Sequence, residues 1–249
     1  MKHVNTSPAY IQAPITREYV ENFYNLVTAD TWTFAIDTGG TIARGVAGGV
    51  VATSDTTDND EAYIHTTSKL VPGTTNSVPF ELTGRLKISV ITDASMFVGL
   101  GSTFGADMLA DTTQVVPATG YLNGLIFLES DSFRARYISV HNAAATVSQL
   151  LDFIPTADTF FSYRLNYQYN SVDSSIVCVP EIDTAGGQNF KPVRTYGGDS
   201  VVHPAFYQSA NVYGAFPAAG LNYGLYFKQG AAAHVATWDY AAWAIRRFN

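Results

Sequence analysis

The sequence predicts an all-β fold, a two-sheet antiparallel jelly-roll sandwich. Short runs rich in Val, Ile, Thr and aromatic residues follow one another from Thr31 onward, with Gly, Asp, Asn and Pro between them. Within several runs apolar and polar residues alternate, as they do on a strand with one buried face. Because no amphipathic helix pattern separates the runs, two packed sheets are favoured over an α/β fold.

The composition limits the kinds of partner and site. The 249-residue chain is 47% hydrophobic and 14% charged, whereas average soluble domains are roughly 25% charged. Much of the surface is therefore expected to be uncharged or to be covered by a partner. A net charge of −7 without a cluster of Lys and Arg argues against nucleic acid. Cys178 is the single cysteine, which excludes an intramolecular disulfide and a cysteine-based zinc site.

The N-terminal residues are predicted to form an arm. Residues 1–14 show no periodicity, and Pro8 and Pro14 indicate an extended segment. They also lack the features of a signal peptide, and no apolar run approaches the roughly 20 residues that span a membrane, so we expect a soluble protein made in the cytosol. We divide the chain into an arm at residues 1–30 and a sandwich domain at residues 31–249.

Within the arm, residues 15–27 are the best helix candidate. Thr16 is a suitable cap, and apolar side chains follow at helical spacing. These side chains are Tyr19, Phe23 and Leu26. The stripe predicts a short helix that either packs on its own domain or docks on a neighbouring protein.

The stretch 58–67 is predicted to be a turn followed by a strand. Its first three residues have short polar side chains that favour turns. The next residues alternate, which places Ala62 and Ile64 on one face and Tyr63 and His65 on the other. Residues 41–54 are expected to be its partner, as one bent or bulged strand, because several glycines interrupt this β-branched run.

Further strands and a core can be predicted from the same signals. The other expected strands lie at residues 31–36, 79–91, 95–102, 123–130, 133–141, 160–169, 174–182, 222–230 and 234–248. The side chains expected in the core or at its edges are Trp32, Phe34, Phe80, Leu82, Phe97, Ile126, Tyr163, Leu165, Ile176, Leu225, Trp238 and Tyr240.

Several of these stretches resemble a known family. Residues 58–66, 80–89 and 96–102 resemble the opening sheet of concanavalin-A-like (LamG-like) jelly rolls found in head structural proteins of tailed phages. Residues 162–187 are similar to the paired strands of such domains, and residues 222–248 resemble their closing hairpin. The long Gly/Ala/Tyr-rich segment 192–223 departs from the simplest members and is a candidate partner surface.

The resemblance implies a virion structural protein, most simply a capsid decoration (cement) protein that stabilises the assembled phage head. It implies the major capsid protein as a partner and self-association as a homo-oligomer such as a trimer. The location would be the capsid surface of the virion, after synthesis in the host cytoplasm. The alternative is a lectin-like module on a phage tail or capsid that binds a carbohydrate or a receptor.

Three local patterns imitate functional motifs but are incomplete. Residues 34–45 imitate a phosphate-binding hairpin and contain the aspartic-protease triplet, yet no second loop or second such Asp completes either site. Glu181 and Asp183 lie two residues apart, as in concanavalin-like glycoside hydrolases, but the next carboxylate is missing. The acidic stretch 55–61 offers oxygen ligands for Ca²⁺ without EF-hand spacing. We therefore expect no enzyme activity, no metal and no cofactor.

Partner binding is assigned to aromatic and aliphatic side chains. The arm carries apolar anchors that it would not bury alone, and Tyr is enriched at protein interfaces and in sugar sites. The Tyr-rich stretches 206–216 and 221–227 suit sandwich packing, a protein interface or a glycan surface. The predicted partner-binding residues are Tyr10, Ile11, Tyr19, Phe23, Tyr213 and Tyr223.

Overall fold

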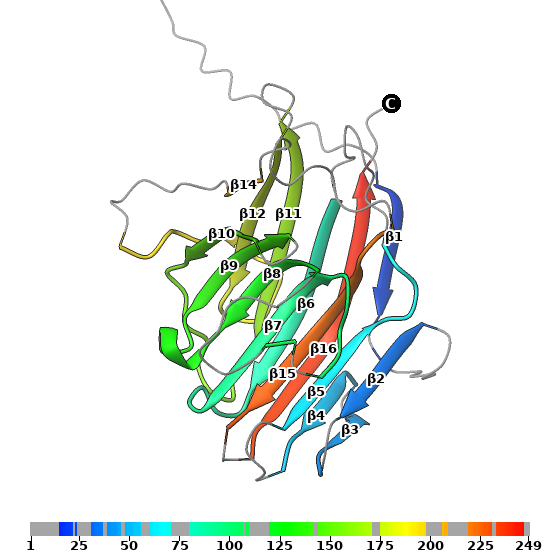
Figure 1. Cartoon of the computed structure of the whole chain (residues 1–249), viewed down its shortest axis with the longest axis vertical. Helices are drawn as coiled ribbons and strands as arrows, with labels where there is room; N and C mark the ends of the chain where they lie inside the picture. The colour runs from blue at the N-terminus through cyan, green and yellow to red at the C-terminus, as the bar shows by residue number, and fades with distance from the viewer. Residues whose placement is uncertain are drawn as a thin grey trace, which may run out of the picture.

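The computed structural model describes residues 15–21, 23, 31–36, 39–45, 48–55, 60–70, 80–106, 108–109, 120–141, 144–170, 175–197, 206–208, 219–230 and 233–246. Within this part of the chain, two antiparallel β-sheets pack face to face (Figure 1). Strands of the two sheets run in nearly the same direction in Figure 1, which is the aligned packing of β-sandwiches. The predicted all-β jelly-roll sandwich is confirmed.

One sheet has nine strands. They are β1 (Ile15–Glu21), β3 (Thr41–Arg44), β4 (Val50–Thr53), β6 (Phe80–Ile88), β11 (Phe161–Asn170), β12 (Ser175–Asp183), β13 (Lys191–Pro192), β14 (Phe206–Gln208) and β16 (Val235–Arg246). The order is β13-β12-β11-β6-β16-β4-β3, with β1 also beside β16 and β14 beside β12. One edge of β16 pairs with β6, and its other edge pairs first with β4 and then with β1.

The other sheet has seven strands. They are β2 (Trp32–Ile36), β5 (Glu61–Thr66), β7 (Ala94–Gly101), β8 (Tyr121–Phe127), β9 (Ala135–His141), β10 (Ala144–Leu150) and β15 (Asn222–Gln229). Their order is β10-β9-β8-β7-β15-β5-β2. The described helical structure is a single 3₁₀ turn at Glu129–Asp131, and no helix in the described ranges is long and apolar enough to cross a membrane.

Alternation along the strands builds the core between the sheets. On β6, buried residues alternate strictly with half-buried ones, and Leu82 and Leu86 are fully buried. Gly84 is the inward position between them, where the rings of Tyr163 and Trp238 occupy the space that a side chain would need. The sequence therefore places its smallest residue where two of the largest core side chains meet.

A second apolar layer covers the outer face of the seven-stranded sheet. Every residue of β7 and β15 is buried, although alternate side chains on a strand point to opposite faces. Phe104 and Leu109 cluster with outward-facing side chains of the sheet, among them Phe97, Ile126 and Tyr226. Both faces of the central strands are thereby removed from water.

The predicted helix over residues 15–27 is wrong, since Ile15–Glu21 forms β1. The backbone of Tyr19 pairs with that of Trp243, and Ile15 pairs with Arg246 at the end of β16. Phe23 follows with a φ of 57° and packs at 0% exposure against Trp32 and Trp238. A local period of apolar residues does not reveal a pairing partner at the other end of the chain.

Residues 41–54 form two strands, not the one bent strand that was predicted. β3 and β4 pair as a hairpin, whose turn is closed by a 3.0 Å hydrogen bond from Gly45 N to Gly49 O. Gly48 and Gly49 have φ values of 94° and 74°, which favour glycine. The predicted pairing of this stretch with β5 is also wrong. The hairpin belongs to the nine-stranded sheet, whereas β5 belongs to the seven-stranded sheet and pairs with β15 and β2.

The predicted core residues fall into two layers. Those buried between the sheets are Trp32, Phe80, Leu82, Tyr163, Leu165, Leu225 and Trp238, with Phe34 packed at the edge. Phe97 and Ile126 are fully buried but belong to the outer layer. Tyr240 is half-buried and lies opposite Arg85, and the side chain of Ile176 lies outside the described residues.

Candidate binding site

Residues 191–196, which we call the strap, connect the edges of the two sheets. At its start the strap pairs with β12 in the nine-stranded sheet, and the N–H of Val193 donates to Pro180 O at 3.0 Å. Further along, the carbonyl of Arg194 accepts a 2.7 Å hydrogen bond from the N–H of Asp152, just beyond β10 of the seven-stranded sheet. The strap therefore closes one side of the sandwich.

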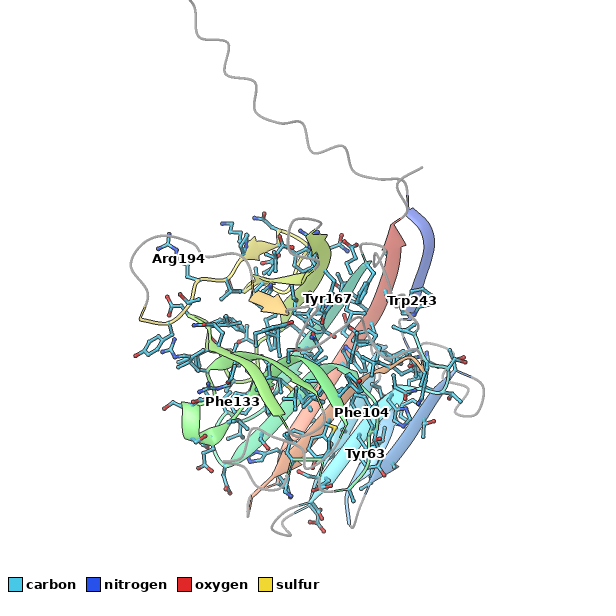
Figure 2. All side chains as sticks on the ribbon, turned by 45° about the horizontal axis from the view of Figure 1, so that its top comes forward. Tyr63, Phe104, Phe133, Tyr167, Arg194 and Trp243 are labelled. Atoms are coloured by element: carbon cyan, nitrogen blue, oxygen red, sulfur yellow. The ribbon has the colours of Figure 1, made fainter. Side chains whose placement is uncertain are left out.

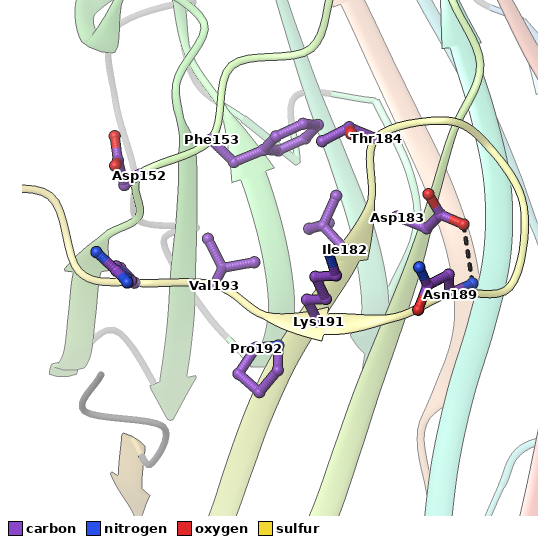
Figure 3. A pocket seen from close by; sticks show the side chains of 10 residues that line it. Asp152, Phe153, Ile182, Asp183, Thr184, Asn189, Lys191, Pro192 and Val193 are labelled. Atoms are coloured by element: carbon purple, nitrogen blue, oxygen red, sulfur yellow. Dashed lines mark hydrogen bonds between the residues drawn. The ribbon is translucent and has the colours of Figure 1, made fainter. Parts of the chain in front are cut away.

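A pocket of about 250 Å³ lies between the strap and the turn after β12 (Figure 3). Its floor is apolar: Phe153, Ile182 and Val193 point toward one another in Figure 3, and each is at most 8% exposed. The ring of Phe153 lies 5.2 Å from that of Phe161 between their centroids, which anchors the floor in the core. The polar lining consists of Asp152, Asp183, Thr184, Asn189, Lys191 and Arg194.

Asp183 shapes the turn that forms one wall of the pocket. Its carboxylate accepts hydrogen bonds from the backbone N–H groups of Ala185 and Asn189, both at 2.9 Å. The bond from Ala185, followed by those from Asn189 and Gly187, lowers the pKa of Asp183 below its ordinary value. The carboxylate is therefore ionised at neutral pH, and backbone donors occupy part of its acceptor sites.

Beside the pocket lies an exposed aromatic ring. Within the described ranges, the exposed large hydrophobic side chains are Tyr196 of the strap, at 53%, and Ile154, at 38%, which follows Phe153 of the pocket floor. The guanidinium of Arg134 lies 3.8 Å from the centroid of the Tyr196 ring and donates to Asp152 Oδ1 at 3.0 Å. Arg134 thus fixes the ring beside the pocket rim and neutralises one of the rim carboxylates.

A second candidate surface is the outer face of the seven-stranded sheet. The rings of Tyr63 and His65 are nearly parallel, 6.4 Å apart, and His65 stacks on Phe104 at 5.3 Å. In Figure 2, Tyr63 and Phe104 lie well away from Arg194 on the strap. These rings stack on one another and are at most half-exposed, so they offer less free ring surface than Tyr196 does.

Comparison with known proteins identifies solved structures that share the fold of this chain. No protein-family model matches the chain, and no curated protein matches its sequence. Among solved structures, peanut lectin with a 9-mer peptide aligns with a TM-score of 0.62 at 10% identity, covering 94% of this chain and 99% of the lectin. The exoplasmic/lumenal domain of VIP36, in a Ca²⁺/Man3GlcNAc-bound form, gives 0.57 at 9% identity, covering 91% and 87%.

A protein of unknown function from Shewanella oneidensis MR-1 aligns with a TM-score of 0.55 at 14% identity, covering 93% of this chain and 89% of that protein. The similarity thus extends over nearly the whole of each chain. The sandwich therefore shares the fold of these lectin structures. At these identities the similarity establishes the fold alone, and the predicted concanavalin-A-like architecture is confirmed.

The sandwich buries two of the predicted partner-binding residues. Phe23 and Tyr223 are both 0% exposed, and the ring of Tyr223 packs edge-on against Trp238 in the inter-sheet core. Neither side chain is available to a partner in this structure, because both rings fill space in the core between the two sheets. Tyr19 is placed through its backbone in β1. Tyr10, Ile11 and Tyr213 lie outside the described residues.

The two carboxylates that resemble a hydrolase pair have separate structural roles. Glu181 and Asp183 lie on one face of β12, as their spacing predicts, opposite Arg164 and Ser162 of β11. Glu181 is ion-paired with Arg164, while Asp183 holds its turn and lines the pocket. They therefore do not face each other across a common cleft.

The other incomplete motifs fall partly outside the described ranges. Of the acidic stretch, Asp58 and Asn59 are not described, while Glu61 is ion-paired with Lys228. No group of three or more His, Cys, Asp or Glu side chains in the described part of the chain is arranged to hold a metal ion. Asp37 of the aspartic-protease triplet also lies outside the described residues.

Sequence patterns identified the residues of the pocket only in part. Phe153, Asp183 and Val193 come from three separate segments, which the strap brings together. Two signals were present: Asp183 was named in the incomplete hydrolase pair, and Val193, Arg194 and Tyr196 lie in the long segment 192–223 that was named as a candidate partner surface.

Proposed function

We propose that this protein is a lectin-like carbohydrate-binding module that holds a sugar in the strap pocket, with Tyr196 beside it. The observation that carries the proposal is the combination of an apolar floor, a hydrogen-bonding rim and a 53% exposed ring at one place on the surface. The peanut lectin and VIP36 structures, whose fold this chain shares, support carbohydrate as the ligand class.

The chemistry of the pocket suits a sugar. A sugar ring has apolar C–H faces and a rim of hydroxyl groups, so it needs an apolar or aromatic surface together with hydrogen-bonding side chains. Phe153 and Val193 offer the apolar surface, while Asn189 and Thr184 offer donors and acceptors at the mouth. The remaining lone pairs of Asp183 can accept from a sugar hydroxyl, since a carboxylate has about four acceptor sites.

We infer binding without hydrolysis. A glycoside hydrolase needs one carboxylic acid whose raised pKa lets it donate a proton, and a second carboxylate as nucleophile or base. The lowered pKa of Asp183 makes it a poor acid, and Asp152 is held in an ion pair with Arg134. The three similar structures named above carry no enzyme name, which is consistent with a binding protein.

The capsid-decoration role implied by the phage resemblance stays a prediction, as do its major capsid protein partner and its oligomeric state. None of the three similar structures is named as a virion protein. A sugar-binding module on a phage tail or capsid would join the two interpretations, and the proposed sugar site can be tested independently of where the protein is located.

A glycan array probed with the full chain tests the proposal, followed by isothermal titration with the sugars that bind. We expect Tyr196→Ala to weaken binding about tenfold, because the stacking of a ligand ring on an aromatic side chain contributes roughly 1 kcal/mol or more. Tyr63→Ala is the matched control, since it removes a tyrosine ring from the second candidate surface. Thermal melts of both variants report whether they remain folded.

Two results would count against this assignment. If no glycan binds the folded wild-type protein, the lectin-like function fails. If Tyr63→Ala abolishes binding and Tyr196→Ala does not, the function survives but the site moves to the outer face of the seven-stranded sheet.

A further inference from the structure

The pocket rim carries two basic side chains that no acidic side chain of the described ranges pairs with. Six basic side chains of the described ranges form ion pairs: Arg85, Lys87, Arg134, Arg136, Arg164 and Lys228. Lys191 and Arg194 line the pocket, are exposed, and make no ion pair with any described residue. In a chain of net charge −7, two such cations at one pocket favour an anionic ligand.

The two carboxylates of the pocket do not cancel this charge for a ligand. Asp183 is surrounded by the backbone N–H groups of Ala185, Gly187 and Asn189, so its charge is stabilised by its own turn. Asp152 is paired with Arg134 at 3.0 Å. With Arg134 counted against Asp152, Arg194 keeps its charge free for a ligand within the described ranges, and Lys191, whose effect is the smallest of those that lower the pKa of Asp183, adds a second positive charge.

The shape of the pocket limits the size of the ligand. About 250 Å³ lies just below the roughly 300–1,000 Å³ of pockets for drug-sized ligands, so it suits one sugar residue and not a buried chain. An apolar floor would lie against one face of that sugar ring while its charged substituent faces the strap. Arg binds a carboxylate or sulfate through two parallel N–H groups, and Lys contributes a point charge.

From this geometry we infer that the strap pocket selects an acidic sugar residue, one carrying a carboxylate or sulfate that is bound by Arg194 and Lys191. The inference rests on the proposed lectin-like function and names the substrate class of the same pocket. The anion-binding groups belong to the strap, while the floor that receives the ring is formed by Ile182 of β12, Phe153 after β10 and Val193 of the strap.

Titration calorimetry with matched methyl glycosides tests this inference on the full chain. The probes are methyl glucuronide and methyl glucoside, which differ in the carboxylate, and methyl glucoside 6-sulfate, which separates sulfate from carboxylate recognition. We expect an acidic glycoside to bind at least tenfold more tightly than the neutral one, and its affinity to fall as salt is added.

The variants Arg194→Gln and Lys191→Gln should each weaken binding of the acidic glycoside about tenfold and leave the neutral glycoside unchanged. Lys69→Gln is the matched control, because Lys69 is an exposed lysine outside the pocket. Both strap side chains are exposed, so the folded state should persist, and thermal melts confirm it.

Equal binding of neutral and acidic glycosides, unaffected by Arg194→Gln and Lys191→Gln, would overturn the inference and leave the lectin-like function standing. Acidic binding that is lost in Lys69→Gln to the same degree would overturn it too, because general surface charge would then explain the selectivity. Absence of binding to every glycan on an array would overturn the proposed function itself.

Discussion

Lys228 and Glu61 form an ion pair between neighbouring strands β15 and β5, although each side chain is only 2% exposed. Nζ of Lys228 lies 2.8 Å from Oε1 of Glu61 and also donates to the carbonyl of Leu109 at 3.2 Å. Leu109 belongs to the apolar layer on the outer face of the sheet. The pair therefore attaches this layer to the two strands beneath it.

Lys228→Met should destabilise the protein by about 3–5 kcal/mol, because it removes the cation from a buried carboxylate. The free energy of unfolding in urea measures the loss. The double variant Lys228→Met with Glu61→Leu should recover most of it, since a well-packed apolar pair can replace a buried ion pair. A single-variant loss below about 1 kcal/mol would show that the carboxylate is solvated or protonated instead.

Gly84→Ala should cost about 1–3 kcal/mol through overpacking. A methyl group at this position would lie 2.6 Å from Cζ of Tyr163 and 2.8 Å from Nε1 of Trp238. Gly105→Ala is the control, because nothing lies within 4 Å of the added methyl group there. Urea denaturation of the two variants side by side tests the contrast, and equal stabilities would contradict it.

The stability contributed by Asp183 should depend on pH. Its pKa is lowered in the folded protein, so its contribution is present above the unfolded pKa of about 3.9 and is lost as pH falls through the lower folded value. We therefore expect Asp183→Asn to lower the melting temperature at pH 7, and the difference from wild type to shrink below about pH 4. A constant difference from pH 7 to pH 3 would contradict the assignment.

Arg134→Gln should weaken sugar binding more than it weakens the fold. Its partner Asp152 is 60% exposed, and exposed ion pairs contribute about 0–1 kcal/mol to stability. The variant releases the Tyr196 ring, however, so binding should fall several-fold. Lys87→Gln removes another surface ion pair, with Asp158, and should leave binding unchanged. Titration calorimetry and thermal melts together separate the two effects.

Cys178 should be unreactive until the protein unfolds. Burial raises the pKa of its thiol well above the ordinary value, and the side chain is 1% exposed. A disulfide reagent at pH 8 is expected to label it slowly in buffer and rapidly in urea. Rapid labelling in buffer would show that the core opens around β12.

The sequence predicted strands well where one face is buried and the other is not. In β5, Ala62 and Ile64 are buried while Tyr63 and His65 are half-buried, as their alternation indicated. The alternation of apolar and polar residues is weaker in strands whose two faces are both covered. Phe97 could be assigned to the core, but not to the outer layer, because the residues that cover it come from another segment.

Elements defined by distant partners could not be predicted from local patterns. Ile15–Glu21 is a strand because β16 offers it an edge, and the same residues in isolation have the spacing of a helix. The pocket is a similar case, since its lining residues Phe153 and Val193 are far apart in the sequence and come together only in the folded chain. The charge of Arg194 could be interpreted only from the structure. In the sequence Arg194 looks like any other surface arginine, and it stands out only once the ion pairs of the other basic residues are known.

The place of β16 inside the nine-stranded sheet has a consequence for synthesis on the ribosome. Val235–Arg246 is the last described strand, yet it separates β6 from β4 and pairs with β1 as well. Until these residues emerge, the nascent chain holds strand edges that have no neighbour, and such edges pair with other chains. The sandwich is therefore expected to complete its fold only after β16 has emerged, and to benefit until then from chaperones that shield these edges.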